Sequence, residues 1–261
     1  MKTILFTGAR SGIICGVIEK LKHKKYEIYV TVHTETQLEV VKEKYRKDKN
    51  VHCMKIDVTD KQDREKLLHL DLDILVCNGA VGYGGSISEI DMNLVRQNFE
   101  VNVFSNFELV QIVIANMIEK NKGKIIFMSS LAAIYPLPFL GSYSATKASI
   151  STLARTLRKE LKYLHSKIEV AVIEPGLYHT GFNQVMFQNK YEWMDVDSYF
   201  SECINRIHQK ERFLEKYIEK KSLRSIEGSI LDAIKDKHTH SIYRAPFVQT
   251  VCAKTYQIFF E

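Results

Sequence analysis

Short apolar runs alternate with amphipathic stretches along the whole chain. The apolar runs predict β-strands at residues 2–7, 27–32, 51–56, 73–77, 124–129 and 168–173, and a late strand near residues 240–244. Each of the first six runs is separated from the next by a stretch of helical character. This alternation predicts the α/β fold class, with a single doubly wound domain, a mainly parallel sheet of about seven strands and helices on both faces.

The pattern continues without a linker rich in proline, glycine or serine. A length of 261 residues is ordinary for one α/β domain. We therefore expect a single domain over residues 1–261, with a substrate-lid segment at about residues 177–225, near the C-terminal end.

A serine, a tyrosine and a lysine in the middle of the chain form a candidate catalytic group. Ser130 stands thirteen positions before Tyr143, and Lys147 stands four positions after it, one turn along a predicted helix. A free phenol has a pKa of about 10, which a nearby ammonium can lower. Ser130 follows a predicted buried strand, and open α/β sheets place ligands at the carboxyl ends of their strands. A hydroxyl, a tuned phenol and a cation indicate a carbonyl or alcohol site, although the tyrosine–lysine spacing alone occurs by chance in many helices.

A glycine-rich turn near the amino terminus supplies supporting context. The run from Gly8 to Gly12 follows the first predicted strand and precedes a helical segment that extends to about Lys25. Glycines let the backbone approach a pyrophosphate, and a helix amino terminus offers free N–H groups. Strand, glycine turn and helix in this order predict a dinucleotide-binding turn.

Six motifs in order resemble the short-chain dehydrogenase/reductase family, in its compact single-domain branch, over nearly the whole length. The positions that carry the resemblance are Thr7, Gly8 and Gly12; Asp57; Asn78 and Gly79; Asn102; Ser130, Tyr143 and Lys147; and Pro175, Gly176 and Thr180. The resemblance implies a Rossmann fold and hydride transfer between a nicotinamide and a carbonyl carbon.

The resemblance also implies catalytic roles. Ser130 would bind the substrate oxygen, Tyr143 would act as acid or base, and Lys147 would lower the pKa of the phenol and hold the nicotinamide ribose. Asn102 would hold a water that links Lys147 to solvent; the alternative is an asparagine bonded to backbone within a helix.

Further residues are expected to bind the cofactor. Asp57 would bond the adenine edge, Asn78 and Gly79 would line the ribose and nicotinamide, and Thr180 would meet the carboxamide. The full predicted set is Thr7, Gly8, Arg10, Ser11, Gly12, Ile13, His33, Asp57, Val58, Asn78, Gly79, Tyr143, Lys147, Pro175, Gly176 and Thr180.

The glycine turn departs from the family pattern at Ile14, which occupies the family's third glycine. A β-branched side chain there is expected to crowd the phosphates, and its replacement by glycine is expected to tighten cofactor binding. Gly16 leaves open a shifted turn.

The end of the second predicted strand bears on cofactor choice. NAD sites usually place an acidic residue there, whereas this chain has Val32 followed by His33. With Arg10 in the glycine turn, these residues favour NADP(H), and NAD(H) stays possible. An exposed loop histidine without a ligand is the alternative for His33.

The substrate pocket is expected to be apolar and aromatic. Its predicted lining is Tyr83, Leu131, Phe139, Leu177, Tyr178 and Met186. Apolar walls suit hydrophobic ligands. The segment at residues 173–182 is similar to the corresponding loop of hydroxysteroid and retinol dehydrogenases, which implies a lipophilic alcohol or ketone. Packing of a lid helix is the alternative explanation for Met186.

Composition narrows the remaining classes. The net charge of +6 comes from lysines spread over helix ends, which predicts solvated faces and no nucleic-acid partner. Five cysteines without a CxxC pair predict reduced thiols and no metal site. No run of eighteen apolar residues occurs and the first strand begins at residue 2, so we expect a cytoplasmic protein without stable membrane insertion.

The sequence predicts an NADP(H)-dependent oxidoreductase that interconverts a hydrophobic secondary alcohol and its ketone. A 3-oxoacyl thioester reductase, whose positive charge would recruit an acidic carrier, is a second hypothesis. A catalytically weak nucleotide-binding sensor or scaffold is a third. By analogy with the family, we expect a homodimer or homotetramer.

Overall fold

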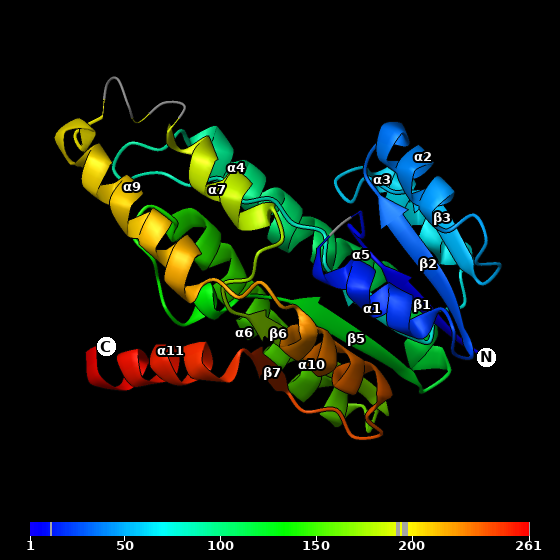
Figure 1. Ribbon diagram of the computed structural model, residues 1–261. Helices are drawn as coiled ribbons and strands as arrows, with labels where there is room; N and C mark the ends of the chain where they lie inside the picture. Colours follow the sequence, from blue (N-terminus) through cyan, green and yellow to red (C-terminus); the bar gives the residue numbers. More distant parts are fainter. Residues whose placement is uncertain (11, 192–193, 195–197, 261) are drawn as a thin grey trace.

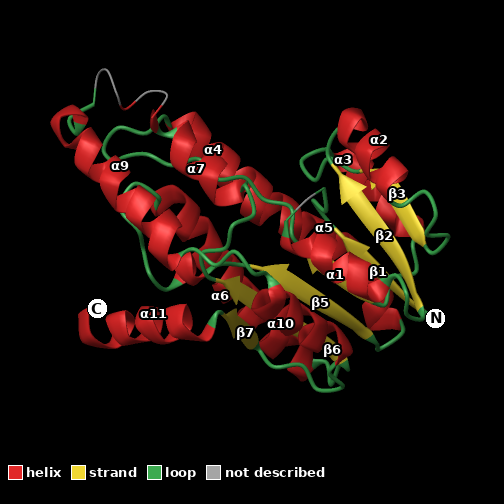
Figure 2. Cartoon of the chain, in the orientation of Figure 1, coloured by secondary structure: helices red, strands yellow, loops and turns green. Residues whose placement is uncertain are grey.

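The computed structural model describes residues 1–10, 12–191, 194 and 198–260. Among these residues seven strands form one parallel sheet in the order β3-β2-β1-β4-β5-β6-β7, with parallel pairing at every step (Figure 2). The strands are β1 (Lys2–Phe6), β2 (Tyr26–Val32), β3 (Val51–Lys55), β4 (Ile74–Cys77), β5 (Gly123–Met128), β6 (Ile168–Pro175) and β7 (Ile242–Ala245). The predicted fold class is confirmed, and the expected strands lie within one or two residues of the observed ones.

Helices follow most strands and cover both faces of the sheet (Figure 1). The α-helices are α1 (Ile13–Leu21), α2 (Glu35–Lys44), α3 (Lys61–Glu65), α4 (Met92–Phe99), α5 (Ser105–Glu119), α6 (Gly141–Tyr163), α7 (Phe182–Asn189), α9 (Ile204–Phe213), α10 (Arg224–Lys235) and α11 (Phe247–Phe260). The short 3₁₀ turns are η1 (Lys66–His69), η3 (Leu131–Ala133) and η4 (Ser201–Cys203), and the π-helical turns are η2 (Glu100–Phe104) and η5 (Leu214–Ile218).

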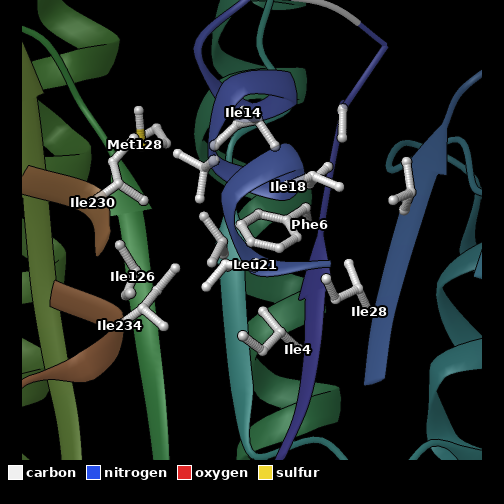
Figure 3. Packing of buried hydrophobic residues seen from close by; sticks show 14 of the residues in the cluster. Ile4, Phe6, Ile14, Ile18, Leu21, Ile28, Ile126, Met128, Ile230 and Ile234 are labelled. Carbon is white, nitrogen blue, oxygen red and sulfur yellow. The ribbon is translucent and has the colours of Figure 1, made fainter. Parts of the chain in front are cut away.

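Alternation of side chains along the strands builds a core on each face of the sheet. Ile4 and Phe6 of β1 pack with α1 and α10, whereas Leu5 between them packs with α5 and α6 on the other face. Figure 3 shows the first of these clusters, in which Ile14 and Ile18 of α1 lie among the side chains of β1. Burial on both faces explains why the strand segments are almost continuously apolar.

The expectation of no membrane-spanning stretch meets one exception. The continuous helix formed by α4, η2 and α5, Met92–Glu119, has a mean hydropathy of 1.4 over its most apolar window, which is enough to cross a membrane by length and composition. Within the protein 44% of that window is buried. A helix that packs on a sheet passes the same test, so this is weak evidence for a membrane span.

The segment between β6 and α10 lies beyond the carboxyl ends of β5 and β6 (Figure 1). Within it α7 is joined to α9 by Lys190, whose buried Nζ lies 2.5 Å from a carboxylate oxygen of Glu211. The bond of 2.8 Å from His179 to Glu219 of the following loop joins the start of the segment to its end. Met186 and Phe187 of this segment pack against Tyr143. Its role as a substrate lid and the single-domain organisation of the chain stay predictions.

Candidate active site

The ends of β1 and β4 are tied together by Thr7 and Asn78. The Thr7 hydroxyl accepts hydrogen bonds from the backbone N–H groups of Asn78, at 2.8 Å, and Gly79, at 3.0 Å. The Asn78 amide donates in return to the carbonyl oxygens of Thr7 and Gly8, both at 3.0 Å. These bonds bring the predicted glycine turn and the predicted nicotinamide loop to one edge of the sheet.

The glycine turn has the shape that a dinucleotide needs. Gly8 has φ +61°, and a Cβ there would lie 2.5 Å from the Cα of Gly79, so only glycine fits. Gly12 has φ +72° and begins α1 with no side chain capping the helix. The first N–H groups of α1, including that of Ile13, are therefore not capped by a side chain and can receive a phosphate. The residues present fit a dinucleotide pyrophosphate; Ser11, also expected here, lies outside the described residues.

Ile14 does not occupy the space where crowding was predicted. Its side chain is 1% exposed and packs in the core between α1 and β1, so protein atoms cover it (Figure 3). The predicted clash with the phosphates is therefore wrong, because the side chain faces the sheet and not the turn.

Gly16 does not shift the turn either. It lies inside α1, where a Cβ would be 1.9 Å from a carboxylate oxygen of Glu227 on α10. Gly16 therefore permits close packing of the two helices, and that role explains its presence two positions after Ile14.

The residues expected to choose the cofactor lie on adjacent loops. Ala9 in the glycine turn donates a backbone hydrogen bond of 3.0 Å to Thr31 of β2. Arg10 and His33, which follow these two residues closely, are both exposed, whereas Val32 is buried. The two loops therefore present the exposed side chains of Arg10 and His33, and the last residue of β2 contributes no carboxylate there.

The loop after β3 holds the predicted adenine-binding residues. The Asp57 carboxylate accepts from the backbone and hydroxyl of Thr59, at 3.0 and 2.7 Å, and is half-buried. Val58 is buried, and its carbonyl accepts a bond of 2.6 Å from Arg64. These contacts fix the loop at the same edge of the sheet as the glycine turn.

Ser130, Tyr143 and Lys147 converge at the end of β5. Ser130 begins η3, where its hydroxyl accepts from the N–H of Ala132 at 3.1 Å. Tyr143 lies in the first turn of α6 and is 7% exposed. The Nζ of Lys147, which is 3% exposed, lies 5.6 Å from the centre of the Tyr143 ring and donates a bond of 2.9 Å to the carbonyl of Met128. The structure therefore brings the predicted catalytic group together.

Burial dominates the electrostatics of this group. It raises the pKa of the Tyr143 phenol, and the hydroxyl of Ser130 opposes that change. Burial also lowers the pKa of Lys147 from 10.5 to about 8. The predicted net lowering of the phenol pKa is wrong, because desolvation of the ring outweighs the other influences on it.

Asn102 lies in the π-helical turn η2, and its side chain bonds to a loop. Its amide accepts from and donates to the backbone of Val81, both at 2.9 Å, and donates to Thr146 of α6 at 3.1 Å. The side chain thus has the backbone-bonding role that the sequence left as the alternative. Its part in a water relay stays a proposal.

Two further asparagines, which the sequence analysis did not single out, extend this arrangement. Asn98 bonds to the N–H and carbonyl of Tyr83, at 3.0 and 2.9 Å, and to Ser142 of α6 at 2.8 Å. Asn106 donates to the carbonyl of Asn102 at 3.0 Å and lies 3.4 Å from that of Gly79. The spacing of four between these asparagines was the available signal, since it places all three on one helical face.

Apolar side chains from the lid cover Tyr143. Met186 and Phe187 of α7 form a buried cluster with Tyr143 and Leu140, and the ring of Phe182 lies 5.9 Å from that of Tyr143. Of the other predicted pocket residues, Leu177 packs against this cluster, Leu131 is buried, Phe139 contacts the ring of Phe200, and Tyr83 is half-buried on the asparagine-bound loop.

Tyr178 is an exception among the predicted pocket residues. Its side chain is 1% exposed, lies in the core with α1 and α10, and bonds through its hydroxyl to Ser225 at 2.7 Å. The prediction that it lines the pocket is wrong, because the loop after β6 turns this side chain toward the sheet.

The loop after β6 closes the cofactor side of the site. Pro175 is buried, and Gly176 donates a bond of 2.7 Å to Ala245 at the end of β7. Thr180 lies beside the glycine turn, since a Cβ at Gly12 would be 3.5 Å from its Cβ.

Among the described residues, no group of three or more histidine, cysteine, aspartate or glutamate side chains could hold a metal ion.

This fold and this site belong to one family. A family model described as short chain dehydrogenase matches residues 2–191. The chain therefore belongs to the short-chain dehydrogenase family, as the motifs predicted, and is an NAD(P)-dependent dehydrogenase or reductase.

Similar proteins agree with that assignment. The uncharacterized oxidoreductase YusZ of Bacillus subtilis is 29% identical over 213 residues, which are 79% of this chain and 75% of that protein. The NADPH-dependent 3-dehydrocapnine reductase of Ornithobacterium rhinotracheale is 31% identical over 188 residues, 67% of this chain and 65% of that protein.

A solved structure shares the fold over nearly the whole chain. The short-chain dehydrogenase/reductase of Burkholderia phymatum in complex with NAD has a TM-score of 0.81 and 20% identity, and the match covers 99% of this chain and 94% of that one. At this identity the likeness shows the fold alone.

Proposed function

We propose that this protein is an NADP(H)-dependent oxidoreductase that interconverts a hydrophobic, steroid- or lipid-like secondary alcohol and its ketone. The observation that carries the proposal is the convergence of Ser130, Tyr143 and Lys147 beneath an apolar cover from α7. A hydroxyl, a phenol and an ammonium suit a carbonyl oxygen, and the apolar cover suits the rest of a hydrophobic ligand.

The bound cofactor supplies or accepts the hydride. The Ser130 hydroxyl donates a hydrogen bond to the substrate oxygen, and Tyr143 transfers a proton to that oxygen as the ketone is reduced. Burial raises the pKa of Tyr143 and makes the phenol a weaker acid, so proton donation depends on the Ser130 hydroxyl, which opposes that rise, and on the nearby ammonium of Lys147. Lys147 holds positive charge below its pKa of about 8 and stabilises the phenolate that remains.

The two exposed groups near the end of β2 support NADP(H). Arg10 and His33 can meet a 2′-phosphate, while Val32 offers no carboxylate to a 2′-hydroxyl. One relative is named as NADPH-dependent, and one similar fold was solved with NAD. NADP(H) is therefore the proposed preference, with weaker binding of NAD(H). The remaining cofactor contacts are those set out above, from Thr7 to Thr180.

The position of the basic residues argues against the thioester reductase alternative. A hollow of about 600 Å³ is lined by lysines that include Lys24, Lys25, Lys122 and Lys235. These residues lie at the amino ends of the strands, at the opposite edge of the sheet from Tyr143. An acidic carrier attracted to this hollow would therefore not deliver its cargo to the site.

We further propose that the protein is a cytoplasmic homo-oligomer.

Replacement of one tyrosine tests the proposal. Tyr143→Phe removes the acidic proton, so we expect kcat for reduction of hydrophobic ketones with NADPH to fall by about 10²- to 10⁴-fold. The Kd for NADPH should stay within about twofold, because the ring remains. The control is Tyr163→Phe, at an exposed tyrosine near the end of the same helix, which should leave turnover unchanged. Unaltered turnover in Tyr143→Phe would overturn the proposed function.

A further inference from the structure

A row of buried polar side chains connects the catalytic helix to the far strand of the sheet. The hydroxyl of Ser129 lies 2.8 Å from the carbonyl oxygen of Lys147. The hydroxyl of Ser151 lies 2.8 Å from that of Ser129 and 2.8 Å from a carboxylate oxygen of Glu174. The other carboxylate oxygen of Glu174 accepts a bond of 2.6 Å from the Nε of Arg244 on β7.

The row ends at the segment that holds the catalytic group. Ser129 lies between Met128, whose carbonyl accepts the ammonium of Lys147, and Ser130. Ser151 lies one turn after Lys147 on α6. The two serines therefore join the strand that carries Ser130 to the helical turn that carries Lys147, at a point where a small displacement changes the geometry of both.

The ion pair at the other end of the row is buried on the glutamate side, so its net contribution to stability does not by itself explain its presence. The Glu174 side chain is 1% exposed and that of Arg244 is 19% exposed. Buried ion pairs contribute little net stability, because desolvation offsets the attraction between the charges. A pair buried at the end of a row that reaches Lys147 is better explained by its effect on position.

The number of protons in the row limits how many of its contacts can be hydrogen bonds at the same time. When Glu174 is a carboxylate, the two serine hydroxyls supply two protons for three short contacts. Ser151 donates to Glu174, and Ser129 can donate either to Ser151 or to the carbonyl of Lys147. A glutamine at position 174 would donate its own proton to Ser151 and complete all three bonds while it still accepts from Arg244.

We propose that Glu174, held by Arg244, is a positioning residue that acts through Ser151 and Ser129 to fix Lys147 relative to Ser130. The proposal rests on the proposed function, because it assigns these groups to the same reaction. Glu174 does not touch the reacting atoms. Its carboxylate fixes the distance between α6 and the end of β5, on which the alignment of hydroxyl, phenol and ammonium depends.

Matched variants separate position from stability. Glu174→Ala and Ser151→Ala should each lower kcat about tenfold with the Kd for NADPH within about twofold, and the double variant should lose no more than the larger single loss. Glu174→Gln, in contrast to Glu174→Ala, should keep at least half of the wild-type kcat. The control is Glu169→Ala, at the opposite end of β6, which breaks an ion pair with Lys124 of β5 and should lower thermal stability while leaving kcat unchanged.

The outcomes distinguish this proposal from the proposed function. If Glu174→Ala and Ser151→Ala both keep kcat within twofold of wild type while Tyr143→Phe is inactive, the positioning role is overturned and the proposed function stands. If Glu169→Ala loses kcat as much as Glu174→Ala does, the loss reflects stability and the positioning role is again overturned.

A crystal structure of Ser151→Ala decides the matter without turnover. We expect the bond from the Nζ of Lys147 to the carbonyl of Met128, 2.9 Å in the wild type, to lengthen or break as α6 shifts. An unchanged position of Lys147 would overturn the proposal even if the wild-type protein reduced none of the ketones tried.

Discussion

Burial sets the protonation of the two ionisable groups at the centre of the site. Tyr143 and Lys147 are both covered by protein atoms, and burial favours the neutral form of each. Burial makes the phenol of Tyr143 a weaker acid, which the Ser130 hydroxyl partly opposes. The ammonium of Lys147 is still mostly charged at pH 7, and its burial in that form lowers the stability of the fold.

Removal of that ammonium should stabilise the protein. Burial lowers the pKa of Lys147 from 10.5 to about 8, so between these pH values the unfolded chain binds more protons and wild-type stability rises with pH. Lys147→Met should increase the free energy of unfolding by about 2 kcal/mol at pH 7, after the loss of one hydrogen bond. The gain should be complete below pH 8 and be lost by pH 10.5, above which Lys147→Met should be about 1 kcal/mol less stable than the wild type because only the loss of the hydrogen bond remains. Denaturant unfolding at several pH values measures it.

An exposed lysine on the same helix provides the control. Lys159→Met should change the free energy of unfolding by less than about 0.5 kcal/mol at every pH. Equal stabilities of Lys147→Met and the wild type across this pH range would show that the ammonium pays no desolvation penalty.

Ile14 shows how a side chain's direction decides its effect. Since it packs in the core, Ile14→Gly should cost about 4 kcal/mol of stability, from the cavity and from the glycine in a helix. Cofactor affinity should not rise, contrary to the expectation from the sequence. Thermal unfolding and NADPH titration of Ile14→Gly measure both effects, with Ile14→Val as the mild control at about 1 kcal/mol. Tighter binding by Ile14→Gly would restore the crowding interpretation.

At the scale of elements, the long helix formed by α4, η2 and α5 organises the site by hydrogen bonding. Asn98, Asn102 and Asn106 line one face of it and hold the loop between β4 and α4. Ser142 and Thr146 of α6 complete the bonds of the first two. Side chains of the long helix thus satisfy the backbone N–H and carbonyl groups of Val81 and Tyr83 in this loop.

Asn98→Ala should loosen that loop. It leaves the N–H of Tyr83 without its partner, at a cost of about 1 to 3 kcal/mol, while the carbonyl of Tyr83 keeps the hydroxyl of Ser142, and we expect KM for the ketone to rise more than kcat falls. Hydrogen exchange should show weaker protection at Tyr83. Asn93→Ala, at an exposed asparagine of the same helix, is the control and should change neither the KM for the ketone nor the protection at Tyr83. Intact protection at Tyr83 in Asn98→Ala would contradict the role given to this asparagine.

The strands and the catalytic group could be predicted because each depends on local pattern. A strand buried on both faces is apolar throughout, and Tyr143 and Lys147 are one helical turn apart whatever surrounds them. Three other features could not be predicted, since each depends on residues far away in the chain. They are the direction of the Tyr178 side chain, the burial of Ile14 and the contact of Gly16 with Glu227. The sign of the pKa change at Tyr143 was missed for the same reason: the lid that buries it is 40 residues further along.

At the scale of the whole molecule, the candidate site and the lysine-lined hollow lie at opposite edges of the sheet. The dinucleotide turn, the catalytic group and the lid follow the carboxyl ends of the strands, while the lysine-lined hollow precedes the amino ends. This arrangement is that of an enzyme whose ligands enter at one edge. The net charge of +6 therefore describes the surface as a whole and does not identify the substrate.

Titration of the purified protein with NADPH and with NADH, followed by nicotinamide fluorescence, tests whether the protein binds the dinucleotide that its proposed reaction needs. Every step assigned to Ser130, Tyr143 and Lys147 requires a dinucleotide in the turn that Gly8 and Gly12 form. The account predicts saturable binding of both, with a Kd for NADPH at least about tenfold below that for NADH, a difference of about 1.4 kcal/mol from contacts with the 2′-phosphate. Failure of the protein to bind either dinucleotide would contradict the account and favour a scaffold without turnover.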